Sequence, residues 1–126
     1  ESLSEQMHNA DMEAEELRGR TGELDTYGYK NRIPPQTVYR IQSLFEEFCK
    51  EILLPALPDP RISFTVEYDE QKSEADVIIL YNGEPFDPQN TDNQLSWKIV
   101  QNDAENIVYS EINEAPYRNK VAIRVK

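Results

Sequence analysis

The chain contains few of the residues from which catalytic and metal sites are most often built. Its 126 residues include one histidine, His8, and one cysteine, Cys49. A single histidine excludes a multi-histidine metal site, and its acidic helical surroundings predict an exposed polar residue rather than a member of a catalytic triad. A single cysteine excludes an internal disulfide. Its apolar neighbours predict a buried side chain that behaves as a small hydrophobe.

Glycine is scarce as well. The four glycines do not have the spacing of a Walker or Rossmann phosphate loop. No signal peptide is recognisable, and the longest apolar run is far below the roughly 18 residues that a membrane span requires. With the single cysteine, these absences favour a cytoplasmic protein without a direct membrane span. Since the chain begins at Glu1 and not at a methionine, we expect it to be part of a longer protein.

Positive charge is also in short supply. Lysine and arginine number 13 against 24 aspartates and glutamates, which gives a formal net charge of -11. The basic residues are scattered along the chain rather than clustered, so a phosphate backbone would be repelled. We therefore expect no nucleic-acid partner.

Residues 1–20 predict an N-terminal helix with a narrow apolar seam. Its apolar residues alternate between spacings of four and three, the rhythm of a helix that packs along one line: Leu3, Met7, Ala10, Ala14 and Leu17. Three interpretations stay open. The helix packs on its own domain, forms a dimer stalk, or connects to a preceding domain.

Residues 21–126 predict one domain. Its clearest element is a helix from Pro35 to Leu54, which proline can begin without losing a hydrogen bond. The apolar residues of this helix recur at spacings of three and four: Val38, Ile41, Leu44, Phe45, Phe48, Ile52 and Leu53. A second helix is predicted over residues 95–104, with Leu95, Ile99 and Val100 facing inward.

The strands are predicted from alternation and from apolar runs. Residues 61–69 alternate apolar and polar side chains, whereas residues 75–81 form the apolar run typical of a central strand. A short polar turn between them predicts an antiparallel hairpin. A second hairpin is expected from residues 107–112 and 120–125, and a short edge strand within residues 23–30. This order of elements predicts an α/β domain of the α+β two-layer sandwich type.

The passage from Asn82 to Pro88 resembles a known family. Its residues Gly83, Pro85, Phe86, Asp87 and Pro88 match the Asp-x-Gly-x-x-Phe-Asp-Pro stretch of the anti-sigma-factor serine kinases. That family is a branch of the GHKL superfamily of histidine-kinase-type ATPases, which includes gyrase and the mismatch-repair protein MutL. The resemblance covers about residues 35–126. It implies a Bergerat-like mixed sheet with the helices on one face, and a bacterial regulatory protein.

The resemblance also implies functional residues. In the family, a helix before the hairpin carries a catalytic glutamate and, four residues later, an asparagine that binds magnesium. Glu47 matches the catalytic position, and Glu51 stands at the magnesium position. A spacing of four places both on one helix face. Gly83 and Asn82 fall at the nucleotide-binding loop. The competing interpretation of Glu47 and Glu51 is an ordinary exposed pair.

Three departures from the family pattern weaken nucleotide binding. The position of the adenine-binding aspartate is Tyr81, whose ring would occupy the space of the base, while Asn82 should point to the opposite face. Glu51 would add negative charge beside a triphosphate. The lid, Asp92 to Ser96, has no glycine through which backbone amides could approach phosphates. The turn from Pro85 to Pro88 is then expected to serve packing, with Phe86 covering the end of the sheet.

The leading hypothesis is a degenerate, ATP-independent regulatory domain that binds a protein partner, with no cofactor and with a homodimer as a further possibility. The resemblance implies a sigma factor or an anti-anti-sigma-like protein as the partner. One alternative is an active serine/threonine kinase that uses ATP and Mg²⁺, with Glu47 as the base and Glu51 at the metal. Another is an unrelated α/β module in which the motif match is accidental.

Overall fold

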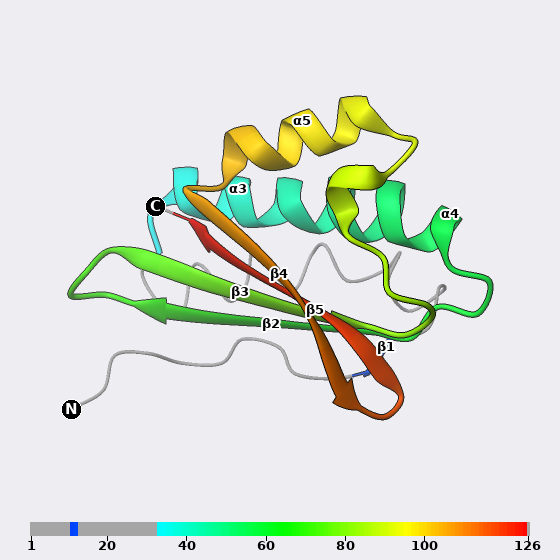
Figure 1. The fold of residues 1–126 in the computed structure, drawn as a ribbon. Helices are drawn as coiled ribbons and strands as arrows, with labels where there is room; N and C mark the ends of the chain where they lie inside the picture. The colour runs from blue at the N-terminus through cyan, green and yellow to red at the C-terminus, as the bar shows by residue number, and fades with distance from the viewer. Residues whose placement is uncertain (1–10, 13–32, 126) are drawn as a thin grey trace.

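Helices and strands form two separate layers in the computed structural model of the protein, which describes residues 11–12 and 33–125 (Figure 1). The helices lie together on one face of the sheet, as Figure 1 shows. The predicted two-layer α+β sandwich, with its helices on one face, is therefore confirmed. Within the described part of the chain, no helix combines the length and the apolar character needed to cross a membrane.

One continuous helical segment forms the base of the helical layer and confirms the helix predicted from Pro35 to Leu54. It ends where Leu57 adopts an extended conformation. All seven apolar residues predicted to face inward are buried, and Cys49 is buried with them. The segment consists of α3 (Pro35–Leu44), a π-helical stretch η1 (Phe45–Leu53) and a last turn α4 (Leu54–Ala56).

The second predicted helix exists as α5 (Gln94–Asp103), but one inward-facing residue was assigned incorrectly. Leu95 is 74% exposed, whereas Ser96, Trp97 and Val100 are buried. The side chain of Asn93 caps the helix by accepting a hydrogen bond from the backbone N–H of Ser96. This start turns the face that carries the three buried residues toward α3 and η1, with which α5 is in contact.

The sheet has the strand order β1-β2-β3-β5-β4. Both predicted hairpins are confirmed, and β3 lies at the centre as its apolar run indicated. Every pairing among the described strands is antiparallel, so this part of the sheet contains no parallel pair of the kind that a mixed sheet implies. The strand bounds are β1 (Asp11–Met12), β2 (Ile62–Asp69), β3 (Glu74–Tyr81), β4 (Asn106–Glu114) and β5 (Tyr117–Val125).

Few of the residues before position 33 are described. Asp11 and Met12 pair with Ser63 and Ile62 at the edge of the sheet, so the helix predicted over residues 1–20 is wrong at these two positions. The rest of that helix, His8 and the strand predicted within residues 23–30 lie outside the described residues.

The core lies between the two layers. β2 contributes Ile62, Phe64, Val66 and Tyr68, all buried as the alternation predicted. The ring of Phe45 on η1 meets that of Phe64 edge to face, with 4.9 Å between the ring centroids. Because η1 is anchored on the sheet in this way, the positions of Glu47 and Glu51 relative to the end of β3 are fixed by core packing.

Candidate functional site

β3 ends at Tyr81, where the resemblance places the adenine-binding aspartate. The side chain of Tyr81 is completely buried, and its ring packs edge to face against Phe48 and Phe86. Its hydroxyl donates a 2.6 Å hydrogen bond to the carbonyl of Phe86. Burial, and to a smaller extent the neighbouring Tyr109 and Asp87, raises the pKa of Tyr81 above its ordinary value. The protein's own side chain thus fills this position.

The side chain of Asn82 is bonded to the backbone near the end of β3. Its Oδ1 accepts a hydrogen bond of 2.9 Å from the N–H of Arg61, and its Nδ2 donates one of 2.7 Å to the carbonyl of Asp59. These contacts tie the end of β3 to the residues just before β2. Both ends of the amide of Asn82 are therefore engaged within the protein.

Gly83 makes the turn out of β3 possible. Its φ of +94° is a conformation that L side chains rarely adopt, and a Cβ added there would lie 3.1 Å from Cδ2 of Leu57. The glycine therefore has a structural reason to occupy this position.

The loop after Gly83 is held by Asn119, a fully buried residue on β5 that the sequence analysis did not identify. Its Oδ1 accepts hydrogen bonds from the backbone N–H of Phe86 at 2.8 Å and from the hydroxyl of Tyr109 at 2.6 Å. Its Nδ2 lies 3.3 Å from each of the carbonyl oxygens of Tyr81, Asn82 and Glu84. One amide thus fixes the course of the whole segment that suggested a nucleotide loop.

The turn that follows is a packing element, as predicted. Phe86 packs against the core, and Pro88 is buried at the start of a short 3₁₀ helix, η2 (Pro88–Asn90). The carboxylate of Asp87 accepts hydrogen bonds from both the backbone N–H and the side-chain amide of Gln89. Asp87 therefore caps the helix that follows it.

Glu47, the proposed catalytic base, contacts α5. Its Oε1 accepts a 2.7 Å hydrogen bond from the hydroxyl of Ser96, which is buried. In the family, a glutamate at this position would face the phosphates. Here its carboxylate is bonded to a serine of the protein's own second helix.

Glu51, the proposed magnesium ligand, is exposed, and its backbone is linked to the start of α5. In an α-helix the carbonyl of Glu51 would accept a hydrogen bond from residue 55, but Pro55 has no N–H. Nδ2 of Asn93 donates to this carbonyl at 3.3 Å, while Oδ1 of the same residue caps the N–H of Ser96. An anion would compete with Asn93 for the start of α5.

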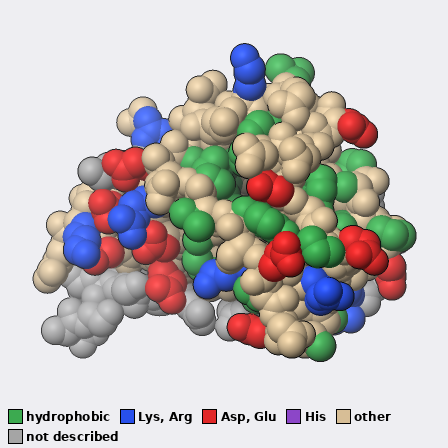
Figure 2. Space-filling view, in the orientation of Figure 1, with side chains coloured by type: hydrophobic (Ala, Val, Ile, Leu, Met, Phe, Trp, Pro, Cys, Tyr) green, Lys and Arg blue, Asp and Glu red, His purple; other side chains and the backbone are tan. Residues whose placement is uncertain are grey.

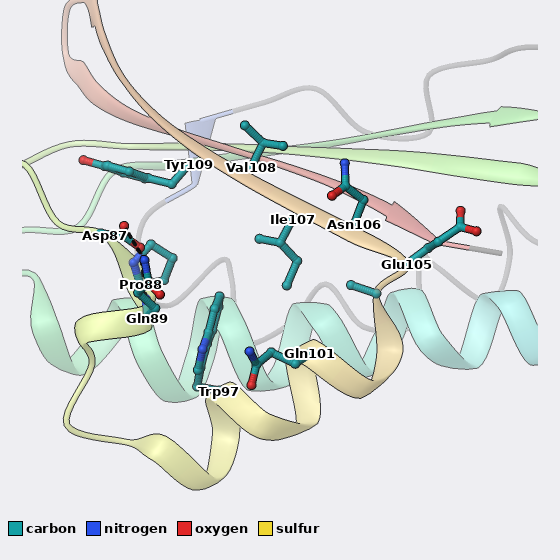
Figure 3. Close-up of a pocket in the computed structure, with 11 residues that line it drawn as sticks. Asp87, Pro88, Gln89, Trp97, Gln101, Glu105, Asn106, Ile107, Val108 and Tyr109 are labelled. Carbon is teal, nitrogen blue, oxygen red and sulfur yellow. Dashed lines mark hydrogen bonds between the residues drawn. The ribbon is translucent and has the colours of Figure 1, made fainter.

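Two surface clefts lie near these residues. The first has a volume of about 590 Å³ and lies between α5, η2 and β4 (Figure 3). Trp97 points into it from α5 and Ile107 from β4. The second, of about 710 Å³, lies beside Gly83. It is lined by the loops around Leu57, Phe86 and Pro116. Asn82 and Gly83 both line the second cleft. Neither of these two clefts is lined by Glu47 or Glu51, so neither brings the proposed catalytic and metal residues together with the nucleotide residues.

No metal centre is evident in the residues that the structure describes. Among them, no group of three or more histidine, cysteine, aspartate or glutamate side chains could hold a metal ion. Cys49 is fully buried, and burial raises the pKa of its thiol well above the ordinary value. A thiol of raised pKa in an apolar site is a poor nucleophile, which agrees with the predicted packing role.

No family model matches the chain, and no curated protein matches it significantly. The resemblance to the anti-sigma-factor kinases therefore depends on residues 82–88 and on the order of elements alone.

Proposed function

We propose that this chain is a cytoplasmic regulatory domain that binds a protein partner and does not bind ATP. The contact that supports this proposal most directly is the hydrogen bond between Ser96 and Glu47. It joins the helix that would carry the catalytic base to the helix that would follow the nucleotide lid. A nucleotide would have to separate these two groups.

The other two ligand positions support the same proposal. The buried ring of Tyr81 occupies the position of the base, and its hydroxyl is already bonded to Phe86. Asn93 caps α5 where phosphates would meet the backbone amides. A nucleotide would therefore have to displace internal contacts at three places, each worth about 1 kcal/mol of stability. The antiparallel sheet gives the family resemblance no added weight.

Equilibrium titration with Mg-ATP, followed by calorimetry, tests the absence of nucleotide binding. We expect no saturable heat up to millimolar nucleotide. Micromolar binding that needs magnesium and disappears in Glu51→Ala would instead support the kinase alternative. Glu114→Ala is the matched control, because it removes an exposed glutamate from the far end of β4.

Without nucleotide binding, a protein is the expected partner of the domain. The resemblance points to a sigma factor or an anti-anti-sigma-like protein, and a second copy of the chain is a further candidate. Sedimentation of the purified domain over a range of concentrations tests for a homodimer. A domain that stays monomeric would bind a different protein instead.

A further inference from the structure

β4 is an edge strand that is well suited to pair with another strand. In the strand order it lies last, and among the described strands its only neighbour is β5. Residues Asn106 to Glu111 pair with β5 in unbroken register, and Val108 is 50% exposed. Along an edge strand, alternate residues direct their N–H and C=O groups away from the sheet.

The usual protections against edge pairing are weak on this strand. Natural edges are blunted by charged side chains, by proline or by a bulge. From Asn106 to Ser110 the strand has no charged residue, and its first is Glu111. The sequence of β4 contains neither lysine nor proline, and its register irregularity begins only after Glu111. The edge from Asn106 to Glu111 is therefore regular, and no other strand of the described residues pairs with it, so it is suited to main-chain hydrogen bonding with an added strand.

The first cleft adjoins this edge and could receive side chains of an added strand. Figure 3 shows Ile107 pointing from β4 toward α5, and Trp97 pointing back toward β4. The rest of the apolar lining consists of Pro88, Ala104, Val108 and Tyr109. In strand addition, the main chain supplies affinity, and pockets for alternate side chains supply specificity. The edge and the cleft together provide both.

The charge around the cleft indicates what kind of segment would bind. Its lining includes Asp87 and Glu105 but no lysine or arginine, and Glu111 is exposed farther along the strand. Lys120 pairs with Ser110, so the pleat places it on the opposite face of the sheet from Ile107. In Figure 2, green apolar side chains spread across the middle of the visible face, with red acidic side chains and some blue basic ones among them.

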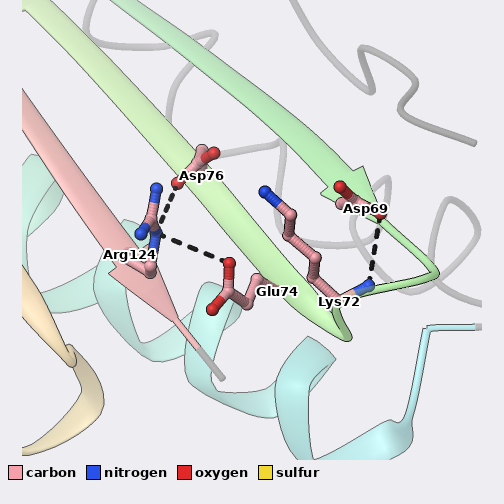
Figure 4. A network of polar contacts seen from close by, with 5 residues as sticks. All are labelled: Asp69, Lys72, Glu74, Asp76 and Arg124. Atoms are coloured by element: carbon pink, nitrogen blue, oxygen red, sulfur yellow. Dashed lines mark hydrogen bonds and ion pairs between the residues drawn. The ribbon is translucent and has the colours of Figure 1, made fainter. Parts of the chain in front are cut away.

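One cation lies beside the start of β4. Arg124 on β5 pairs with Asn106, and its Nε lies 3.2 Å from Asp76 and 3.8 Å from Glu74 near the β2–β3 hairpin (Figure 4). Glu105 also interacts with Arg124, so neither sign of charge dominates at this end of the strand. The acidic groups farther from Arg124 are Asp87 in the cleft and Glu111 along the strand.

We propose that the edge from Asn106 to Glu111, together with the first cleft, binds an extended segment of a partner protein that carries lysine or arginine. The segment adds a strand to β4, places apolar side chains against Trp97 and Ile107, and brings its positive charges to the acidic rim. A second copy of this chain would present like charges at the same edge, which disfavours it. This inference depends on the proposed function as a protein-binding domain.

The test uses a short synthetic peptide that alternates valine and threonine between lysine ends. It is added to the isotope-labelled chain while the amide signals are followed by NMR. We expect saturable shifts in the signals of residues 105–111 and slower hydrogen exchange at alternate amides of β4. The same peptide with glutamate ends should bind at least about tenfold more weakly at low salt. A version with N-methylated backbone amides should lose binding, because it cannot pair as a strand.

Charge reversal on the protein supplies the matched comparison. Glu111→Lys/Glu114→Lys should weaken binding of the lysine peptide about tenfold, because both exposed glutamates lie on β4. Glu67→Lys/Glu70→Lys makes the same change in net charge near the β2–β3 hairpin and should leave the affinity within about twofold.

Several outcomes would overturn the inference. They are equal binding of the two peptides, undiminished binding of the methylated peptide, or shifts confined to residues outside β4 and the cleft. A dimer in which β4 amides are protected without any peptide would assign the edge to a second copy. ATP binding contradicts the proposed function separately, whereas peptide failure without ATP binding removes only this surface.

Discussion

The hydroxyl of Ser96 donates a 2.7 Å hydrogen bond to Oε1 of Glu47 and thereby joins α5 to η1. The two residues are 49 positions apart in the chain. Their contact engages the carboxylate that the family resemblance would direct toward the phosphates of a nucleotide. The carboxylate of Glu47, which was the candidate base, is thus part of the interface between η1 and α5.

Ser96→Ala should destabilise the domain by about 1 kcal/mol, because the partly buried carboxylate of Glu47 loses a charge-assisted donor. Urea unfolding monitored by circular dichroism measures this as a lower midpoint with an unchanged slope. Ser110→Ala, on the exposed surface of β4, is the control and should leave the midpoint unchanged. Equal effects of the two variants would show that the contact contributes nothing.

Asn119→Ala should cost about 3 kcal/mol of unfolding free energy. It leaves the N–H of Phe86, the hydroxyl of Tyr109 and three loop carbonyls without the amide that they share. Thermal and urea unfolding measure the loss, and amide NMR should show the largest shifts at residues 82–86. Asn113→Ala, at an exposed position, is the control. A loss below about 1 kcal/mol would argue against this role of Asn119.

Gly83→Ala should destabilise the domain by about 1–2 kcal/mol, since φ at this position is +94° and the new Cβ would crowd Leu57. The measurement is the urea midpoint, compared with Glu84→Ala at the exposed neighbouring residue. If Gly83→Ala were as stable as its control, the left-handed turn would not be required for the loop.

Local pattern was sufficient to predict most of the fold. The helix from Pro35 and the two hairpins follow from apolar spacing and short polar turns, which are properties of neighbouring residues. The inward face of α5 was predicted incorrectly at Leu95 because it depends on the contact between Asn93 and the carbonyl of Glu51. That contact joins residues 42 positions apart, so the spacing of apolar residues within the helix cannot reveal it.

The candidate site was less accessible from sequence. Tyr81 could be singled out from the sequence because a large ring stands where the family pattern has an aspartate. Asn119 was missed, although a signal existed: it shares the two-residue phase of Val121, Ile123 and Val125, which places a polar side chain on the buried face. Its five partners come from β3, β4 and the loop, and only the folded chain brings them together.

Tyr81→Phe removes the hydroxyl of Tyr81 and keeps its ring, so it measures the contribution of the hydroxyl alone. At neutral pH the unfolding free energy of the variant should be about 1 kcal/mol lower than that of the wild type. The hydrogen bond to the carbonyl of Phe86 disappears, while the ring packing remains. Burial raises the pKa of Tyr81 in the folded state above its ordinary value of 10.0. Below pH 10.0 both states keep the proton, so the contribution of the hydroxyl is fully present.

Above that pH the unfolded state releases the proton first, so the unfolding free energy of the wild type falls as the pH rises further. Tyr81→Phe lacks this titration and should lose less stability between neutral and strongly alkaline pH. The difference in unfolding free energy between the wild type and Tyr81→Phe should therefore shrink or change sign as the pH rises. Urea unfolding at a series of pH values measures it. Tyr39→Phe, at a position that is 68% exposed, is the control and should follow the wild type. If the difference in unfolding free energy between the wild type and Tyr81→Phe stayed constant with pH, titration of Tyr81 would not be the cause of the loss of stability at alkaline pH.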